Sequence, residues 1–232
     1  QDLLRASIYN AANQHRLGAN EAPPAIISVF LGTEVTRMLD LMETAVVDRK
    51  MTPDEKTELK LNIGRIPEII LDTTDRNRTS PFAFTGNRFE YRAVGSSANC
   101  ASALIILNAV VASQLNTFRT EVDTLVEKGV KKDEALFQVL KRLIIESKPI
   151  RFNGNGYSQE WVEEAARRGL TNVSNVPEAL SAFLRPGHVQ LLKELDILSE
   201  RELHGRVEVE YEKFTKKVQI ESRVLGDLAI NH

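Results

Sequence analysis

From Ala101 onward, apolar residues recur every three or four positions, and this pattern constrains the fold more than any other feature of the sequence. Such spacing predicts amphipathic helices, because side chains three and four positions apart share one helix face. The first helix is expected to run from Ala101 to near Gly129. Its apolar stripe contains Leu104, Leu107, Val111, Leu115, Phe118, Val122 and Leu125.

The same spacing predicts four more helices, at about 133–145, 158–168 and 177–184 and from 200 onward. Gly169 is placed to end the helix before it, because glycine readily adopts the left-handed conformation found after many helices. A Ser-Glu-Arg-Glu sequence from 199 has the spacing of a capping box and marks the start of the last helix. The C-terminal part of the chain is therefore expected to be mainly helical.

The first hundred residues are less regular. Residues 9–24 are predicted to form a loop, because they end in two consecutive prolines that a helix interior does not accept. Apolar spacing predicts a helix over 25–47, with Gly32 as its weak point. Another helix is expected to begin near Thr52, before an extended and irregular stretch at 63–75.

One segment follows β rather than helical periodicity. Residues 81–92 carry aromatic side chains at alternate positions on both sides of a Thr-Gly-Asn sequence suited to a tight turn. A β-hairpin is therefore predicted. Because strand side chains alternate between faces, Arg88, Glu90 and Arg92 are expected to share one face of the second strand.

The composition supplies further limits. With 232 residues and a formal net charge of −2, the chain is expected to form one large or two small domains, without a general attraction to nucleic acid or membranes. We expect an α+β fold divided into residues 1–100 and 101–232, with no membrane-spanning stretch. The single cysteine, Cys100, excludes an internal disulfide, suits the cytoplasm and is expected to be a small core residue.

Two groups of charged residues outside the hairpin are candidate sites. Arg16 and Glu21 lie in the loop before the two prolines, where they could be ordinary surface charges. Arg76 and Arg78 lie beside amide and hydroxyl donors. Because guanidinium groups bind phosphate through paired hydrogen bonds, this second group is either a phosphate site or a mixed-charge turn.

The third group is Arg88, Glu90 and Arg92 on the hairpin. Glu90 could form ion pairs with arginines across the strands. Its carboxylate could instead bind Mg²⁺ or Mn²⁺, with the arginines on a phosphate beside the metal. The residues alone leave both interpretations open.

Other conspicuous residues are interpreted as structural. The Gly-Asn-Gly sequence at 154–156 lacks the lysine and hydroxyl of a phosphate-binding loop. His188 and His204 have no nearby partners at metal-binding spacing. Tyr157 and Trp161 are expected to pack against the protein rather than to stack on a ligand.

Four blocks of sequence are specific enough to indicate a family. They are HRLGANEAPPAIIS at 15–28, TDRNRTSPFAFTGNRFEYRAVGSS at 74–97, FNGNGYS at 152–158 and QIESRVLGDLA at 219–229. Together they closely resemble the type III (long-chain) glutamine synthetases, and the resemblance extends over nearly the whole chain.

This resemblance implies an enzyme that uses ATP to join ammonium to the side-chain carboxylate of L-glutamate, giving L-glutamine through a γ-glutamyl phosphate intermediate. It implies two divalent metals, Mg²⁺ or Mn²⁺, in the complete site, since phosphoryl transfer needs electrostatic stabilisation. It also implies a dodecamer of two hexameric rings. In the fold, residues 1–100 would belong to the catalytic domain and include the closing hairpin of a half-barrel.

The resemblance implies roles for the two residues of the N-terminal loop. Arg16 matches the arginine that binds the carboxylate of glutamate. Glu21 matches the flap glutamate that shields the intermediate and takes a proton from ammonium. The spacing between the two is one residue shorter than in the short-chain types.

Roles also follow for residues in and before the hairpin. Glu90 matches a metal-binding glutamate, and Arg92 matches the arginine that contacts the transferred phosphate. Arg88 matches a residue on the nucleotide side. Arg78, or alternatively Arg76, matches the arginine of the family's Asn-Arg-Ser motif. The second arginine of that motif is replaced here by an aromatic run.

The family's other metal ligands and its small N-terminal β domain do not occur in this sequence, and Glu90 alone cannot bind two metals. Both sequence ends also fall within apolar periodic segments. We therefore expect a piece of a longer polypeptide that is inactive alone. Two alternatives are another glutamate–amine ligase of the same superfamily and a non-catalytic helical scaffold that retains parts of the site.

Overall fold

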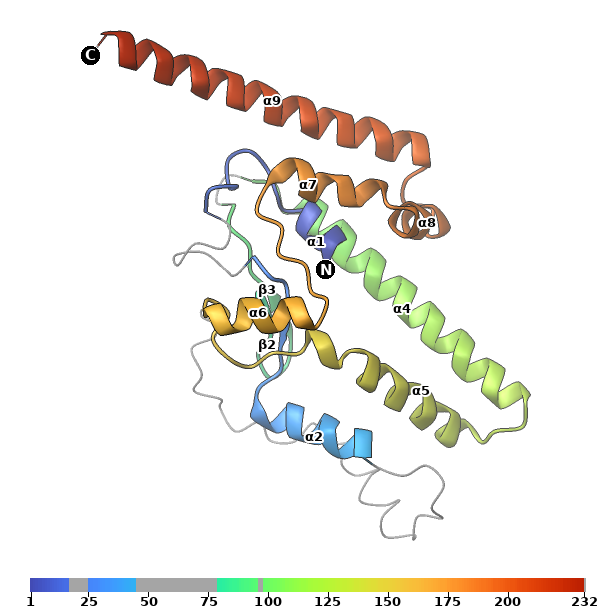
Figure 1. Ribbon diagram of the computed structural model, residues 1–232. Helices are drawn as coiled ribbons and strands as arrows, with labels where there is room; N and C mark the ends of the chain where they lie inside the picture. Colours follow the sequence, from blue (N-terminus) through green and yellow to red (C-terminus); the bar gives the residue numbers. More distant parts are fainter. Residues whose placement is uncertain (17–24, 45–78, 96–97, 232) are drawn as a thin grey trace.

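The computed structural model describes residues 1–16, 25–44, 79–95 and 98–231, and confirms an α+β chain that is mainly helical (Figure 1). The helix predicted to begin near Thr52 and the extended stretch at 63–75 lie outside these residues. The elements, in chain order, are α1 (Asp2–Ala6), β1 (Val29–Phe30), α2 (Thr33–Thr44), β2 (Phe82–Phe84), β3 (Phe89–Tyr91), α4 (Ala101–Glu127), α5 (Lys132–Glu146), η2 (Lys148–Ile150), α6 (Gln159–Arg167), α7 (Val176–Ser181), η3 (Ala182–Leu184), α8 (Pro186–Glu194) and α9 (Glu200–Asn231).

The predicted hairpin is confirmed as part of a small sheet of order β1-β2-β3. Strand β1 runs parallel to β2, and β2 runs antiparallel to β3. The amide of Thr85 donates to the carbonyl oxygen of Arg88 across the turn at 2.8 Å. Gly86 has a φ of 102°, a backbone conformation that residues with a Cβ rarely adopt, so the turn depends on glycine at this position.

The helix predicted over 25–47 was only partly right. Residues 29–30 form β1, and the helix, α2, begins at Thr33. Gly32 has a φ of 79°, which interrupts helical geometry. The side-chain oxygen of Asn153 accepts hydrogen bonds from the amides of Gly32 and its predecessor at 3.2 and 3.1 Å, so a residue far along the chain stabilises this break.

The C-terminal helices largely follow the prediction. Helices α4 and α5 lie side by side, joined by a turn in which Gly129 has a φ of 90°, and they bury Val122 and Val139 between them (Figure 1). At the start of α9, the Ser199 amide donates to the Glu202 carboxylate at 2.9 Å, and the Glu202 amide donates to the Ser199 hydroxyl at 3.3 Å. This pair confirms the capping box.

One expectation about the start of α4 was wrong. Cys100, at the N-terminal end of this helix, is exposed rather than part of the core. By length and composition alone, α4 could also cross a membrane, although one such helix is weak support for a membrane protein. Because its apolar residues are not confined to the side that packs on the protein, large side chains such as Leu115 and Val111 remain exposed in the described chain.

Candidate functional site

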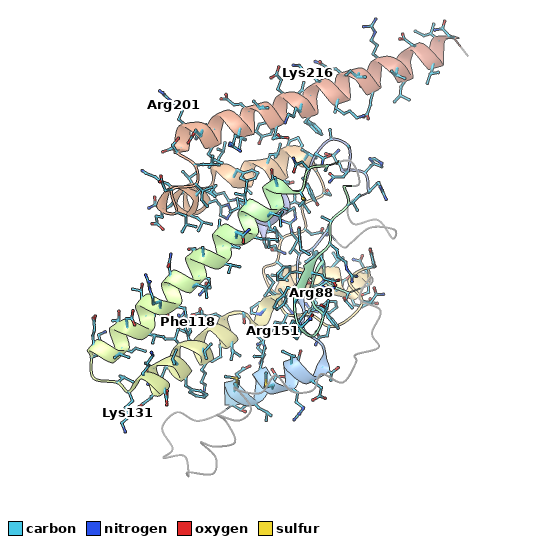
Figure 2. All side chains as sticks on the ribbon, turned by 180° about the vertical axis from the view of Figure 1, so that it is seen from behind. Arg88, Phe118, Lys131, Arg151, Arg201 and Lys216 are labelled. Atoms are coloured by element: carbon cyan, nitrogen blue, oxygen red, sulfur yellow. The ribbon has the colours of Figure 1, made fainter. Side chains whose placement is uncertain are left out.

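The charged face of the hairpin forms one connected group on β3. Arg88 Nη2 lies 3.5 Å from Glu90 Oε1, and Arg92 Nη2 lies 3.1 Å from Glu90 Oε2. The residue directly across the sheet from Glu90 is Ala83. These two ion pairs therefore run along one strand rather than across the sheet. Figure 2 shows the position of Arg88 beside the sheet.

The two ion pairs are partly open to solvent. The side chains of Glu90 and Arg92 are 32% and 28% exposed, and that of Arg88 is 72% exposed. Ion pairs open to solvent contribute only about 0–1 kcal/mol. Among the described side chains of β3, two guanidinium groups flank one carboxylate, and guanidinium groups are well suited to phosphate oxygens.

The two faces of the sheet give this group a rigid base. The strand register places Phe30 and Ala83, which are fully buried, on the same face as Glu90. The opposite face carries a cross-strand cluster of aromatic rings, in which Phe82 and Phe89 stack with centroids 5.0 Å apart. The neighbouring Tyr91 is also part of this cluster, and burial raises the pKa of its hydroxyl. The charged face is therefore backed by a packed layer.

A chain of hydrogen bonds fixes the sheet against the loop at 151–153. Ser28 Oγ donates to Ser80 Oγ at 2.6 Å, and Ser80 Oγ donates to the carbonyl oxygen of Phe152 at 3.0 Å. Phe152 in turn stacks on buried Trp161 of α6, with ring centroids 3.7 Å apart. This confirms that Trp161 has a packing role. Close contact with the Phe152 ring also explains Gly154, because a Cβ there would lie 2.7 Å from it.

Arg16 lies at the end of a tight turn that contacts the exit of β3. Its amide donates to the carbonyl oxygen of Asn13 at 3.0 Å. The side-chain amide of Asn13 donates to the carbonyl oxygen of Val94 at 2.8 Å, two residues after Arg92. The structure therefore links the turn carrying Arg16 to the strand carrying Glu90 and Arg92.

The remaining predicted site residues, Glu21, Arg76 and Arg78, lie outside the described residues. Within the part of the chain that the structure describes, no group of three His, Cys, Asp or Glu side chains is placed to bind a metal. Glu90 is thus the candidate ligand that this part offers, and it would need further ligands from elsewhere.

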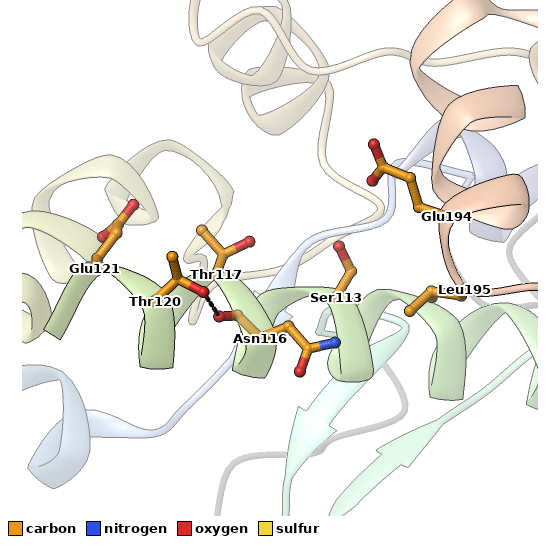
Figure 3. Close-up of a pocket in the computed structure, with 7 residues that line it drawn as sticks. All are labelled: Ser113, Asn116, Thr117, Thr120, Glu121, Glu194 and Leu195. Carbon is orange, nitrogen blue, oxygen red and sulfur yellow. Dashed lines mark hydrogen bonds between the residues drawn. The ribbon is translucent and has the colours of Figure 1, made fainter. Parts of the chain in front are cut away.

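A separate open pocket of about 320 Å³ lies between α4 and the end of α8 (Figure 3). Six of its seven lining residues bear hydroxyl, amide or carboxylate groups: Ser113, Asn116, Thr117, Thr120, Glu121 and Glu194, with Leu195 as the seventh. Sequence reasoning missed it, because these side chains resemble the solvent face of a helix. The lining contains no arginine or lysine, so it does not fit a phosphate-bearing substrate.

Comparison with known proteins decides the family. Residues 135–232 match the glutamine synthetase C-terminal domain. Over all 232 residues, the chain is 65% identical to a glutamine synthetase of Bacteroides fragilis. The chain belongs to the glutamine synthetase family. This confirms the family predicted from the sequence blocks.

Other members of the glutamine synthetase family show the same relationship. The chain is 42% identical over 228 residues to a type-3 glutamine synthetase of Dictyostelium discoideum, and 36% identical over 231 residues to a glutamine synthetase of Butyrivibrio fibrisolvens. These alignments cover 98% and 97% of the chain, and the Bacteroides alignment covers all of it. The chain nevertheless spans only about a third of the length of these relatives, 32%, 30% and 31% in the order given above.

Proposed function

We propose that the full-length protein containing this chain makes L-glutamine from L-glutamate, ammonium and ATP through a γ-glutamyl phosphate intermediate. The observation that carries the proposal is the carboxylate of Glu90 held between Arg88 and Arg92, in a chain 65% identical to a glutamine synthetase. Phosphoryl transfer requires positive charge around the transferring group, and this face of β3 supplies it.

In this proposal each hairpin residue has a distinct part. Arg92 contacts the transferred phosphate, and Arg88 contacts the nucleotide side. Arg88 and Arg92 approach different oxygens of Glu90 and thereby orient its carboxylate. Glu90 is a hard oxygen donor of the kind that Mg²⁺ and Mn²⁺ prefer. When bound, these ions neutralise charge on the phosphate oxygens.

The other predicted residues act on glutamate and ammonium. Arg16 binds the carboxylate of glutamate. Glu21 covers the site as a flap and accepts a proton from ammonium. Arg78, or Arg76 in its place, binds phosphate. The turn that holds Arg16 next to the exit of β3 supports this arrangement, since both substrates must meet at one place.

The proposal extends to the setting of the enzyme. We propose a dodecamer of two hexameric rings in the cytoplasm, with the hairpin closing a catalytic half-barrel and without a nucleic-acid or membrane partner. The near-neutral net charge supports the absence of a nucleic-acid or membrane partner, and the single cysteine supports the cytoplasm.

The test is steady-state glutamine formation by the full-length protein and its Glu90→Gln variant. Losing the charged oxygen donor is expected to lower activity by about 100-fold or more, with a higher metal requirement. Glu146→Gln is the matched control, because Glu146 is an exposed carboxylate paired with Arg142 on α5, and its loss is expected to leave activity unchanged.

The outcomes separate the alternatives. Unchanged activity of the Glu90→Gln variant would reject the metal role of Glu90. Turnover with another amine but not with ammonium would identify a different glutamate–amine ligase. Absence of turnover with ammonium and with every amine tried would favour a non-catalytic scaffold.

A further inference from the structure

Asn13 is a fully buried polar residue beside the proposed site, with 2% of its surface exposed. Its side-chain nitrogen donates to the carbonyl oxygens of Ile8 and Val94, each at 2.8 Å. Its side-chain oxygen accepts from the amide of Asn10 at 2.9 Å. One amide group therefore joins the end of the N-terminal segment, the turn at 10–16 and the exit of β3.

The bond to Val94 bridges 81 positions of sequence. On one side of this bond, the Asn13 backbone carbonyl accepts from the amide of Arg16 at 3.0 Å. On the other side, Val94 follows Arg92 by two residues, and the amide of Arg92 is itself fixed to the carbonyl oxygen of Pro81 at 2.8 Å. The path from Arg16 to Arg92 thus passes through a few well-defined hydrogen bonds.

The turn is also held on its other side. The side-chain oxygen of Gln14 accepts from the amide of Val176, at the start of α7, at 2.8 Å. Gln14 is hydrogen-bonded to the start of α7, and Asn13 is hydrogen-bonded to the exit of β3. The turn is therefore held on both sides. Removing the Asn13 side chain would release the contact that faces the hairpin and leave the one that faces α7.

We propose that Asn13 is a positioning residue for glutamate: it holds the turn that carries Arg16 at a fixed place relative to Arg92. The inference rests on the proposed function, in which Arg16 binds glutamate and Arg92 contacts the phosphate that is transferred to it. Transfer requires these two substrates to be held in register, and a misplacement of about 1 Å costs about 100-fold in rate.

The experiment uses the full-length enzyme and two substitutions. Asn13→Ala removes all three hydrogen bonds. Asn13→Asp keeps the shape and the acceptor for Asn10 but cannot donate to Ile8 or Val94. Both variants are expected to raise the KM for glutamate by about 10-fold or more and to lower kcat/KM for glutamate by about 100-fold. The KM for ATP is expected to change less than about twofold.

A stability control separates positioning from general loosening of the fold. Val139→Ala opens a small cavity between α4 and α5, where Val139 is buried, and is expected to lower the Tm without changing the KM for glutamate. Asn13→Gln retains the amide on a longer side chain and is expected to recover part of the lost glutamate affinity. If neither the Ala nor the Asp variant assembles, the KM for glutamate of this Gln variant decides the question.

Each result has a definite meaning. A rise in the KM for glutamate alone supports the positioning role. Equal changes for glutamate and ATP, or the same kinetics as Val139→Ala at equal Tm, would overturn it. If the unmodified full-length protein forms no glutamine, the proposed function itself has failed. Unchanged kinetics of the Asn13 variants in an active enzyme would reject only this inference.

Discussion

Ser80 lies at the centre of the hydrogen-bond chain beneath the hairpin, and its replacement by alanine is expected to be the most costly single change there. Ser28 and Ser80 are 1% and 2% exposed. The Ser28 hydroxyl donates to Ser80, and the Ser80 hydroxyl donates to the carbonyl oxygen of Phe152. Three segments distant in sequence therefore meet at the Ser80 oxygen.

The two serines differ in what their loss leaves behind. Ser28→Ala removes one hydrogen bond and leaves the Ser80 donor still satisfied by Phe152, so the expected loss is about 0.5–1.5 kcal/mol. Ser80→Ala removes both bonds and strands the buried Ser28 donor and the Phe152 carbonyl oxygen. The buried unsatisfied Ser28 donor costs about 1–3 kcal/mol, and the lost bond to the partly buried Phe152 carbonyl oxygen costs about 1 kcal/mol more. The expected loss is therefore about 2–4 kcal/mol.

Amide hydrogen exchange of peptides spanning 81–95 in the full-length protein measures this difference locally. A loss of about 2–4 kcal/mol corresponds to exchange about 30- to 700-fold faster, provided that exchange requires opening of the hairpin. The Ser28→Ala/Ser80→Ala double variant is expected to be no less stable than Ser80→Ala alone, because the stranded donor is gone. A larger loss for Ser28→Ala than for Ser80→Ala, or simple additivity, would refute the reasoning.

Three further predictions concern α6, the 154–156 loop and α9. Trp161→Ala is expected to cost about 3–5 kcal/mol. Trp161→Phe is expected to cost about 1 kcal/mol or less, because the buried indole nitrogen has no partner in the described chain; equal losses in α6 exchange would contradict this. Gly154→Ala is expected to displace the Phe152 ring and cost about 1–3 kcal/mol, and an unchanged Tm would show that the ring can yield. The Ser199 hydroxyl and backbone amide hydrogen-bond the carboxylate of Glu202 and hold its pKa below its ordinary value. The contribution of this cap to stability is therefore complete above the ordinary pKa of glutamate, about 4.3, and is lost as pH falls through the lower pKa of the folded state. Amide hydrogen exchange at the start of α9 should become faster over this pH range, and the Ser199→Ala variant should lose this pH dependence.

The hairpin and most helices could be predicted because local sequence determines them. Alternating aromatics with Gly86 in the turn specify β2 and β3, and the Ser199–Glu202 pair specifies the start of α9. The charged face of β3 could also be predicted, because side chains alternate between the two faces of a strand. For this reason Arg88, Glu90 and Arg92 could be grouped from the sequence alone.

Features that depend on distant contacts could not be predicted. Strand β1 has two residues, and its apolar neighbours fit helical spacing equally well. What makes it a strand is pairing with β2 on one side and contact with residues 151–152 on the other, since Phe152 donates its amide to the carbonyl oxygen of Val29 at 2.9 Å. The contact between Asn13 and Val94 is equally invisible in the sequence, because nothing near Asn13 specifies a partner 81 positions away.

The site and the surface of the described chain lead to the same conclusion about the size of the working unit. One carboxylate, Glu90, cannot complete a divalent-metal site, and the described residues contain no three-ligand group to do so. Large apolar side chains such as Leu115 and Leu225 are 62% and 66% exposed, and exposed apolar side chains in groups are typical of surfaces that other structure covers. In the proposed function, the further ligands and the apolar cover come from the roughly two thirds of the relatives' length that this chain does not span. Because ligand binding and apolar burial then depend on the same added structure, metal is expected to stabilise the full-length protein but not the 232-residue chain alone.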